Sequence, residues 1–116
     1  MTIGCTCSTM LCEHNKSDMR QFPGGSVRDI NTGKPRYDLI PPKALERVAI
    51  HYATGAAKYG PDNWLKGEGM PREAFIESAF RHFEAMRMNK RDEDHVAACI
   101  WNLMAIAHFE SSGRDK

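Results

Sequence analysis

The stretch HVAACIWNLMAIAHFE, residues 95–110, decides the fold. It carries apolar side chains almost all the way round a helical wheel, from Val96 through Ile100 and Trp101 to Phe109. A helix on the surface of a single domain has one apolar face, whereas a helix that is apolar on every side lies in the centre of a bundle or packs on a partner subunit. The charged turn before it ends in acids, which suit a helix N-terminus. We therefore predict a helix over residues 93–110 at the centre of the fold.

Two further helices are predicted upstream, over residues 42–59 and 71–89, because apolar residues recur there three and four positions apart. Each begins near a proline, and Gly60 followed by another proline ends the first. No strand pattern and no internal repeat is visible. The sequence therefore predicts an all-α fold with three main helices after an extended, loop-rich N-terminal segment. A small domain with an apolar last helix also predicts a homo-oligomer.

The N-terminal part of the chain has no apolar periodicity, so we predict a flexible segment over residues 1–23 and a single helical domain over residues 24–116. Cys5, Cys7, Cys12 and His14 offer four soft metal ligands. Zinc sites usually hold their ligands as two separated pairs, so zinc binding at these cysteines is not expected. Cys99 is predicted to be a small core residue.

Composition excludes several classes of function. The chain has 116 residues, with 16 Lys and Arg against 15 Asp and Glu, and a formal net charge of +1. Such a balance lacks the basic footprint of a nucleic-acid-binding protein. No apolar run approaches the roughly 20 residues of a membrane-spanning helix, and the N-terminus lacks the apolar core of a signal peptide. We therefore expect a cytoplasmic protein that binds neither a membrane nor nucleic acid.

Two polar residues interrupt the apolar last helix. His95 and Asn102 lie two helical turns apart along one stripe. An unpaired buried polar group costs roughly 1–3 kcal/mol, so each needs a partner. One interpretation is a hydrogen bond to a neighbouring helix or to the first loop, and the other is a polar functional site along this stripe. His82 borders the apolar arc of the second helix, where an imidazole is more often a packed residue than a catalyst.

The second helix also carries the acids that a metal site would need. Glu77 and Glu84 stand seven positions apart and project to one side. A divalent ion could bridge such carboxylates through oxygen ligands. The alternative interpretation is the solvated face of a surface helix.

Anion-binding residues concentrate in the extended segment. Lys34 and Arg36 follow Gly33, and glycine lets the backbone approach an anion while Arg offers a fork that matches phosphate oxygens. Tyr37 and Trp64 lie in predicted loops, where each could stack on a base or cover its own core. The chain has no Walker A sequence, no nucleophile elbow and no His-Glu-x-x-His motif, so these mechanisms have no support.

Several motifs stand together between residues 24 and 110: Gly24-Gly25-Ser26, Gly33-Lys34-Pro35-Arg36-Tyr37-Asp38-Leu39-Ile40-Pro41-Pro42, Ala56-x-Lys58-Tyr59-Gly60, Asn63-Trp64, Arg81-His82-Phe83-Glu84-Ala85, and a last helix with His95 and Asn102. In this combination the sequence resembles the phage-encoded family of dATP/dGTP diphosphohydrolases, N-terminal domain. The resemblance implies a phage or prophage protein whose helical domain handles purine deoxynucleotides with a Mg²⁺-type ion.

The first functional hypothesis is therefore metal-dependent hydrolysis of dATP or dGTP to the monophosphate and pyrophosphate. In it Glu77, Glu84 and Asp94 hold the metal ion. The catalytic residues are Glu84, His82 and His95. Cationic, polar and aromatic side chains bind the nucleotide: Lys34, Arg36, Tyr37, Asp38, Lys58, Asn63, Trp64, Arg81 and Asn102.

Two alternatives stay open. A non-catalytic protein could sequester a nucleotide or a cyclic nucleotide signal with the same cationic and aromatic residues, and it would have no need of Glu77 or Glu84. The substitution Glu84→Gln would then discriminate, because only an enzyme should lose activity. A structural protein, whose polar residues only satisfy one another, is the third hypothesis.

Overall fold

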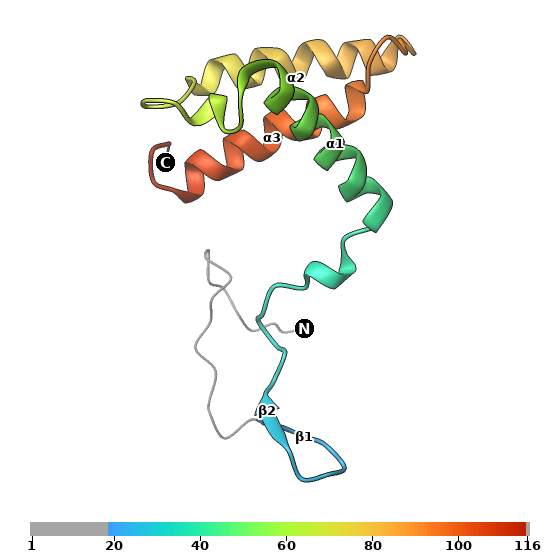
Figure 1. The fold of residues 1–116 in the computed structure, drawn as a ribbon, viewed down its shortest axis with the longest axis vertical. Helices are drawn as coiled ribbons and strands as arrows, with labels where there is room; N and C mark the ends of the chain where they lie inside the picture. The colour runs from blue at the N-terminus through green and yellow to red at the C-terminus, as the bar shows by residue number, and fades with distance from the viewer. Residues whose placement is uncertain (1–18, 116) are drawn as a thin grey trace. The chain divides into compact units, whose positions relative to one another are not determined.

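The computed structural model describes residues 19–115. The chain divides into two compact units, Met1–Ile40 and Pro41–Lys116, and each is described by itself. Three helices build the second unit: α1 (Pro42–Tyr59), α2 (Arg72–Arg87) and α3 (His95–Ser111) (Figure 1). The prediction of an all-α fold with three main helices after a loop-rich N-terminal segment is confirmed.

The first unit contains a small hairpin that the sequence did not predict. Strand β1 (Met19–Gln21) pairs antiparallel with β2 (Val27–Asp29), and the chain turns at Gly25, whose φ is 95°. The expectation of no strand is therefore wrong here, and the segment predicted to be flexible includes β1. Each strand has three residues and all of them are exposed, so no buried face imposes an alternating apolar pattern.

A 3₁₀ turn over Tyr37–Leu39 follows the hairpin in the first unit. The cysteine and histidine residues at positions 5, 7, 12 and 14 lie outside the described residues, so the expectation that they bind no zinc stays a prediction.

The helix ends follow local chemistry. Helix α1 has the predicted bounds and ends at Gly60, which adopts a φ of 90°. Helix α2 stops two residues earlier than predicted, because Asn89 takes the left-handed conformation and Lys90 N–H donates to the Ala85 carbonyl at 2.9 Å, a Schellman stop. Helix α3 starts two residues later than predicted, because the Asp94 carboxylate caps it by accepting from Ala97 N–H at 3.1 Å.

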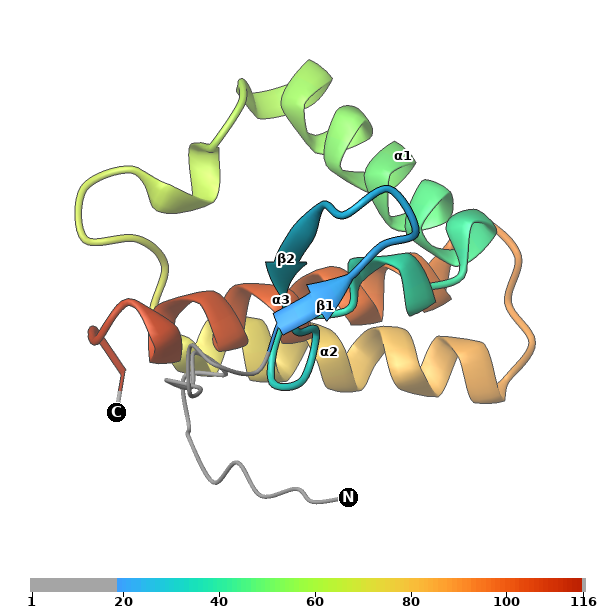
Figure 2. The ribbon, with the colours of Figure 1, turned by 90° about the horizontal axis from the view of Figure 1, so that it is seen from below.

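Helices α2 and α3 run side by side as a hairpin (Figure 1). Figure 2 shows α1 beginning beside the start of α3 and then leading away from it toward the connection to α2. The core lies between α2, α3 and this connection, where Phe75, Ala105 and Phe109 are buried and Trp64 and Trp101 pack against them. The aromatic residues of α2, α3 and the connection thus fill one end of the helix pair.

A glycine lets the connection approach that core. Gly69 has a φ of 80°, and a Cβ atom built there would come within 2.5 Å of the Phe109 ring. Arg114 stacks on Phe109, with its guanidinium carbon 3.5 Å from the centroid of the ring. The same guanidinium donates to the carbonyls of Glu68 and Met70. The C-terminal residues thereby hold the loop after Trp64 against α3.

The outer face of α3 is less buried than its sequence predicts. Ile100, Leu103 and Met104 are exposed, and Leu103 lines an apolar groove of about 340 Å³ between α2 and α3 together with Phe80 and Phe83. Helix α3 is therefore covered on one side within this chain and bare on the other. Among residues 19–115, none of the helices is both long enough and apolar enough to cross a bilayer.

Candidate functional site

A cleft of about 710 Å³ opens in the second unit between α1 and the α2–α3 pair. Its walls are largely aromatic, with Tyr52 and Tyr59 from α1, Trp64 from the connection and Trp101 from α3. Flat aromatic faces of this kind can stack on a nucleobase. The polar side chains in the lining are His51, Asp62, Asn63, Ser78 and His82.

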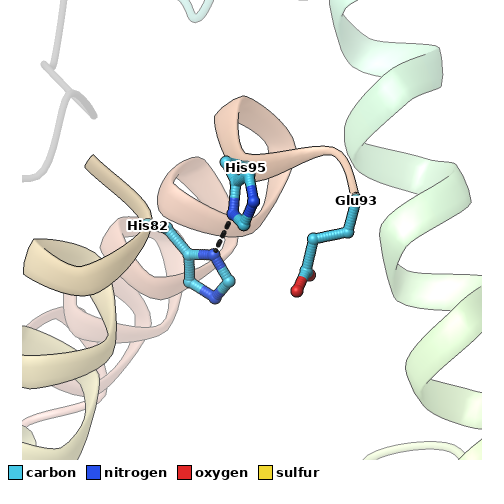
Figure 3. A group of neighbouring side chains, drawn as sticks. All are labelled: His82, Glu93 and His95. Atoms are coloured by element: carbon cyan, nitrogen blue, oxygen red, sulfur yellow. Dashed lines mark hydrogen bonds between the residues drawn. The ribbon is translucent and has the colours of Figure 1, made fainter. Parts of the chain in front are cut away.

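His82 links the cleft to a group of titratable side chains at the other end of the helix pair from the aromatic core. It projects from α2 toward His95, the first residue of α3, and Glu93 approaches from the loop before α3 (Figure 3). One ligand atom from each of the three side chains lies within 4.8 Å of the other two. His95 is buried, His82 is half-buried and Glu93 is exposed, so solvent reaches only part of the group.

The hydrogen bonds of the two histidines define a relay. The Nδ1 atoms of His82 and His95 lie 2.9 Å apart, and Nε2 of His95 lies 2.8 Å from the Asp92 carboxylate. Because a carboxylate can only accept, a neutral His95 donates its Nε2–H to Asp92 and accepts from His82 Nδ1–H. Nε2 of His82 then carries a lone pair, and this nitrogen points away from His95 in Figure 3.

Burial lowers the pKa of His82, and the neighbouring His95, His51 and Arg81 lower it further, while Glu93 opposes the shift. His82 therefore stays neutral at pH 7, where its free lone pair can accept a proton. The hydrogen bond from His95 lowers the pKa of Asp92, so this carboxylate stays ionised and continues to orient the His95 ring.

Asp94 fixes the start of α3 against α1. Its carboxylate accepts from Nε and an Nη atom of Arg47 at 3.0 and 2.7 Å, in addition to capping α3. The Arg47 hydrogen bonds lower the pKa of Asp94 to about 2. The charge of Asp94 is thus already paired within the fold.

The structure brings some of the predicted site residues together. Asn63, Trp64 and His82 all line the cleft, and His95 contacts His82. Asn102 is buried next to this region, and its Nδ2 donates to Ser78 Oγ at 3.1 Å and to the Ala98 carbonyl at 2.9 Å. For Asn102 the structure favours the interpretation of a hydrogen bond to the neighbouring helix.

The acids predicted to hold a metal are not brought together. Asp94 pairs with Arg47, Glu84 is exposed and pairs with Arg87 at 2.9 Å, and Glu77 is exposed on α2. Within residues 19–115, the group of three acids, histidines or cysteines close enough to share an ion consists of His82, Glu93 and His95. The seven-residue spacing placed the acids on one helix face, but that face points to solvent.

The remaining predicted residues fall outside the cleft lining. Lys58 and Arg81 are exposed on α1 and α2. Lys34, Arg36, Tyr37 and Asp38 belong to the first unit, where the Arg36 guanidinium donates to both oxygens of Asp38 at 2.9 and 2.8 Å. The guanidinium proposed to bind phosphate is thus paired with a carboxylate in this structure.

The sequence analysis missed the residues that complete the site. Glu93 and Asp92 were treated only as helix-start acids, and Tyr52 and His51 only as residues of an amphipathic helix. Tyr59 stood in a family motif but was given no role in the site. A signal was present for the first two, since a carboxylate two or three positions before a buried helix-start histidine lies within reach of its ring. No local signal marks the α1 residues, because their role depends on how α1 crosses α3.

The second unit is therefore a helical domain with an aromatic cleft and a group of titratable side chains at the edge of that cleft. Residues 25–116 match the family described as dATP/dGTP diphosphohydrolase, N-terminal. The chain belongs to this family. The comparison with curated proteins and the comparison with solved structures found no match.

Proposed function

We propose that the protein hydrolyses dATP or dGTP to the deoxynucleoside monophosphate and pyrophosphate, with a divalent metal ion. The observation that carries this proposal is the cleft, whose aromatic walls lead to the His82–His95 pair. The family supplies the class of substrate and reaction. The cleft supplies a place where a purine can stack and a water molecule can be activated.

In the proposed reaction, water attacks the α-phosphorus of the nucleotide and the bond from that phosphorus to the bridging oxygen breaks. The monophosphate leaves with the oxygen of water, pyrophosphate leaves with the bridging oxygen, and Nε2 of His82 accepts the water proton. A divalent ion would supply stabilisation of the negative charge that develops on the phosphate oxygens. The contact between the two Nδ1 atoms orients the His82 ring, and Asp92 orients the His95 ring in turn.

The experiment is chromatography of the four deoxynucleoside triphosphates after incubation with the full chain and Mg²⁺, Mn²⁺ or no ion. We expect monophosphate and pyrophosphate from dATP and dGTP, and none without the ion. Tyr59→Ala should raise KM roughly 10-fold, since a base stacked on an aromatic contributes about 1–3 kcal/mol. Met88→Ala, which removes an exposed apolar side chain outside the cleft and outside the groove between α2 and α3, is the control. Hydrolysis of all triphosphates at equal rates, or a KM unchanged in Tyr59→Ala, contradicts the proposal.

A second candidate function is nucleotide binding without turnover. Its supporting observation is that Glu77 and Glu84 stand on the exposed face of α2, outside the cleft, so the acid cluster predicted for catalysis is not assembled. In that case dATP, dGTP or a cyclic nucleotide raises the melting temperature of the protein and is recovered intact.

We also propose that the chain acts as a homo-oligomer. The apolar groove that Phe80, Phe83 and Leu103 line supports this proposal, because burying such side chains against a second copy would add to the small core of the monomer. Sedimentation should give a mass above that of one chain, and Leu103→Glu should reduce it. A monomeric wild-type chain contradicts the proposal.

A further inference from the structure

We infer that His82, Glu93 and His95 form a binding site for a first-row transition-metal ion. The three side chains come from α2, from the loop before α3 and from the first turn of α3 (Figure 3). A histidine pair with one carboxylate is a common ligand set for such ions, because imidazole suits Zn²⁺, Fe²⁺ and Ni²⁺. Mg²⁺ prefers oxygen ligands, so this set favours a different ion from the one that the acids of α2 suggested.

The spacing of the histidines restricts the coordination geometry. Their Nδ1 atoms lie 2.9 Å apart. Two nitrogens at this separation, each about 2.1 Å from an ion, subtend about 90° at the ion. That angle is typical of neighbouring positions in an octahedron, whereas a tetrahedral site needs a wider one. Three ligands on one octahedral face leave the other positions for water or for oxygens of a substrate.

The structure already orients the buried ligand. Asp92 accepts from Nε2 of His95 at 2.8 Å, so the lone pair of His95 is on Nδ1, the atom that faces His82. A histidine that binds a metal usually donates its other ring N–H to a carboxylate, which fixes the orientation and the tautomer of the ring. Binding of an ion would replace the hydrogen bond between the histidines, and His82 would then carry its proton on Nε2.

The location of this site deepens the proposed function. His82 also lines the cleft, so an ion held by it lies at the edge of the space proposed for the nucleotide. If this ion is the one that the reaction needs, His82 would serve as its ligand in place of the proton acceptor of the proposed reaction, and the water proton would pass to solvent. The ion would supply stabilisation of negative charge on the phosphate oxygens. This role rests on the proposed function, whereas binding of the ion does not.

The test is titration of the metal-free full chain with Mn²⁺, with free Mn²⁺ measured by electron paramagnetic resonance. Cys5, Cys7 and Cys12 are replaced by Ser in every protein, so that thiolates do not contribute. We expect one Mn²⁺ per chain, which a hundredfold excess of Mg²⁺ does not displace. Affinity should fall at least about 10-fold in His82→Ala, in Glu93→Gln and in Asp92→Asn. His108→Ala, which removes a histidine of α3 outside this group, should bind as the parent does.

Glu93→Gln keeps the test decisive if a histidine variant does not fold, because Glu93 is exposed. Absence of binding, equal affinity in Glu93→Gln and the parent, or displacement by Mg²⁺ overturns the inference. Stoichiometric Mn²⁺ binding with dATP and dGTP recovered intact supports the metal site and contradicts the hydrolase. Hydrolysis with Mg²⁺ in a protein that binds no Mn²⁺ supports the hydrolase and contradicts the metal site.

Discussion

The two ends of the α2–α3 pair are built from different side chains. At one end, which we call the aromatic end, Trp64, Phe75, Trp101 and Phe109 pack edge to face or stacked, with ring centroids 5.6–6.5 Å apart. At the other, the histidine end, Asp92, Glu93, His82 and His95 come together. The small residues Ala85, Ala97 and Ala98 provide the buried apolar contacts in that half.

This difference separates stability from chemistry. Aromatic side chains bury the most apolar area and dominate the energy of a small core. Alanines bury little, so the histidine end contributes less to folding and can hold groups that exchange protons or bind ions. Substitutions should therefore affect the free energy of unfolding at one end and ligand chemistry at the other.

The largest effect is expected at the aromatic end. Phe75 is 1% exposed, and Phe75→Ala should lower the free energy of unfolding by about 3–5 kcal/mol, since it removes a buried ring and leaves a cavity. Urea unfolding followed by circular dichroism measures this loss. Glu77→Ala on the same helix, where the side chain is exposed, should change stability by no more than about 0.5 kcal/mol. Similar losses in the two variants would show that the core is not where the structure places it.

The next effect belongs to the histidine end and concerns activity. His82→Ala should lower kcat by roughly 100-fold, which is about 2.7 kcal/mol of barrier, because it removes the side chain that acts as proton acceptor or, with an ion bound, as ligand of that ion. Its free energy of unfolding should change by less than that of Phe75→Ala, because His82 is only half-buried. His108→Ala serves as the control, because the His108 ring packs against Trp64 at the aromatic end. An equal fall of kcat in both variants would mean that catalysis is not confined to the histidine end.

The sequence predicted the aromatic end better than the histidine end, for a physical reason. Apolar periodicity reports which face of a helix is buried, so Phe75 and Phe109 could be assigned to the core and the bounds of α1 to Pro42–Tyr59. His82 and His95 were singled out because polar side chains interrupt apolar faces. Their partner Glu93 lies in a loop, and no period connects a loop to a helix that precedes it in the chain.

The predicted metal acids show the limit of the same reasoning. A spacing of seven places Glu77 and Glu84 on one face of α2 but does not say whether that face meets a third ligand or solvent. In the structure it meets solvent, and the third acid, Asp94, pairs with Arg47. The crossing of α1 over α3, which creates the cleft, is likewise a tertiary arrangement that no local pattern encodes.

A smaller effect is expected where α1 joins the histidine end. Asp94→Asn keeps a side-chain acceptor for the cap of α3 but removes the charge that pairs with Arg47. The pKa of Asp94 is about 2 in the folded chain against an ordinary 3.8, so its ionised form stabilises the fold above about pH 4. Because this side chain is 37% exposed, we expect about 1 kcal/mol rather than the full value of the shift.

The difference in unfolding free energy between wild type and Asp94→Asn should therefore be present at pH 7 and vanish as the pH falls from 4 toward 2. Urea unfolding at several pH values measures it. Asp38→Asn removes a comparable ion pair with the exposed Arg36 and should leave stability unchanged at every pH. A difference that persists unchanged at pH 2 would assign the effect to the cap alone.

The smallest effect is expected from Glu84→Gln, which makes the same Glu-to-Gln change at an exposed ion pair that Glu93→Gln makes at the histidine end. Glu84→Gln removes a surface contact with Arg87, so the free energy of unfolding should change by less than about 0.5 kcal/mol and kcat by less than about twofold. Glu93→Gln makes the same substitution at the histidine end and should reduce hydrolysis with Mn²⁺, because this carboxylate lies beside His82 and His95. Steady-state hydrolysis of dATP and dGTP compares the two. If Glu84→Gln is the inactive variant and Glu93→Gln is not, the acidic face of α2 holds the ion, as its spacing first suggested, and the histidine end is structural.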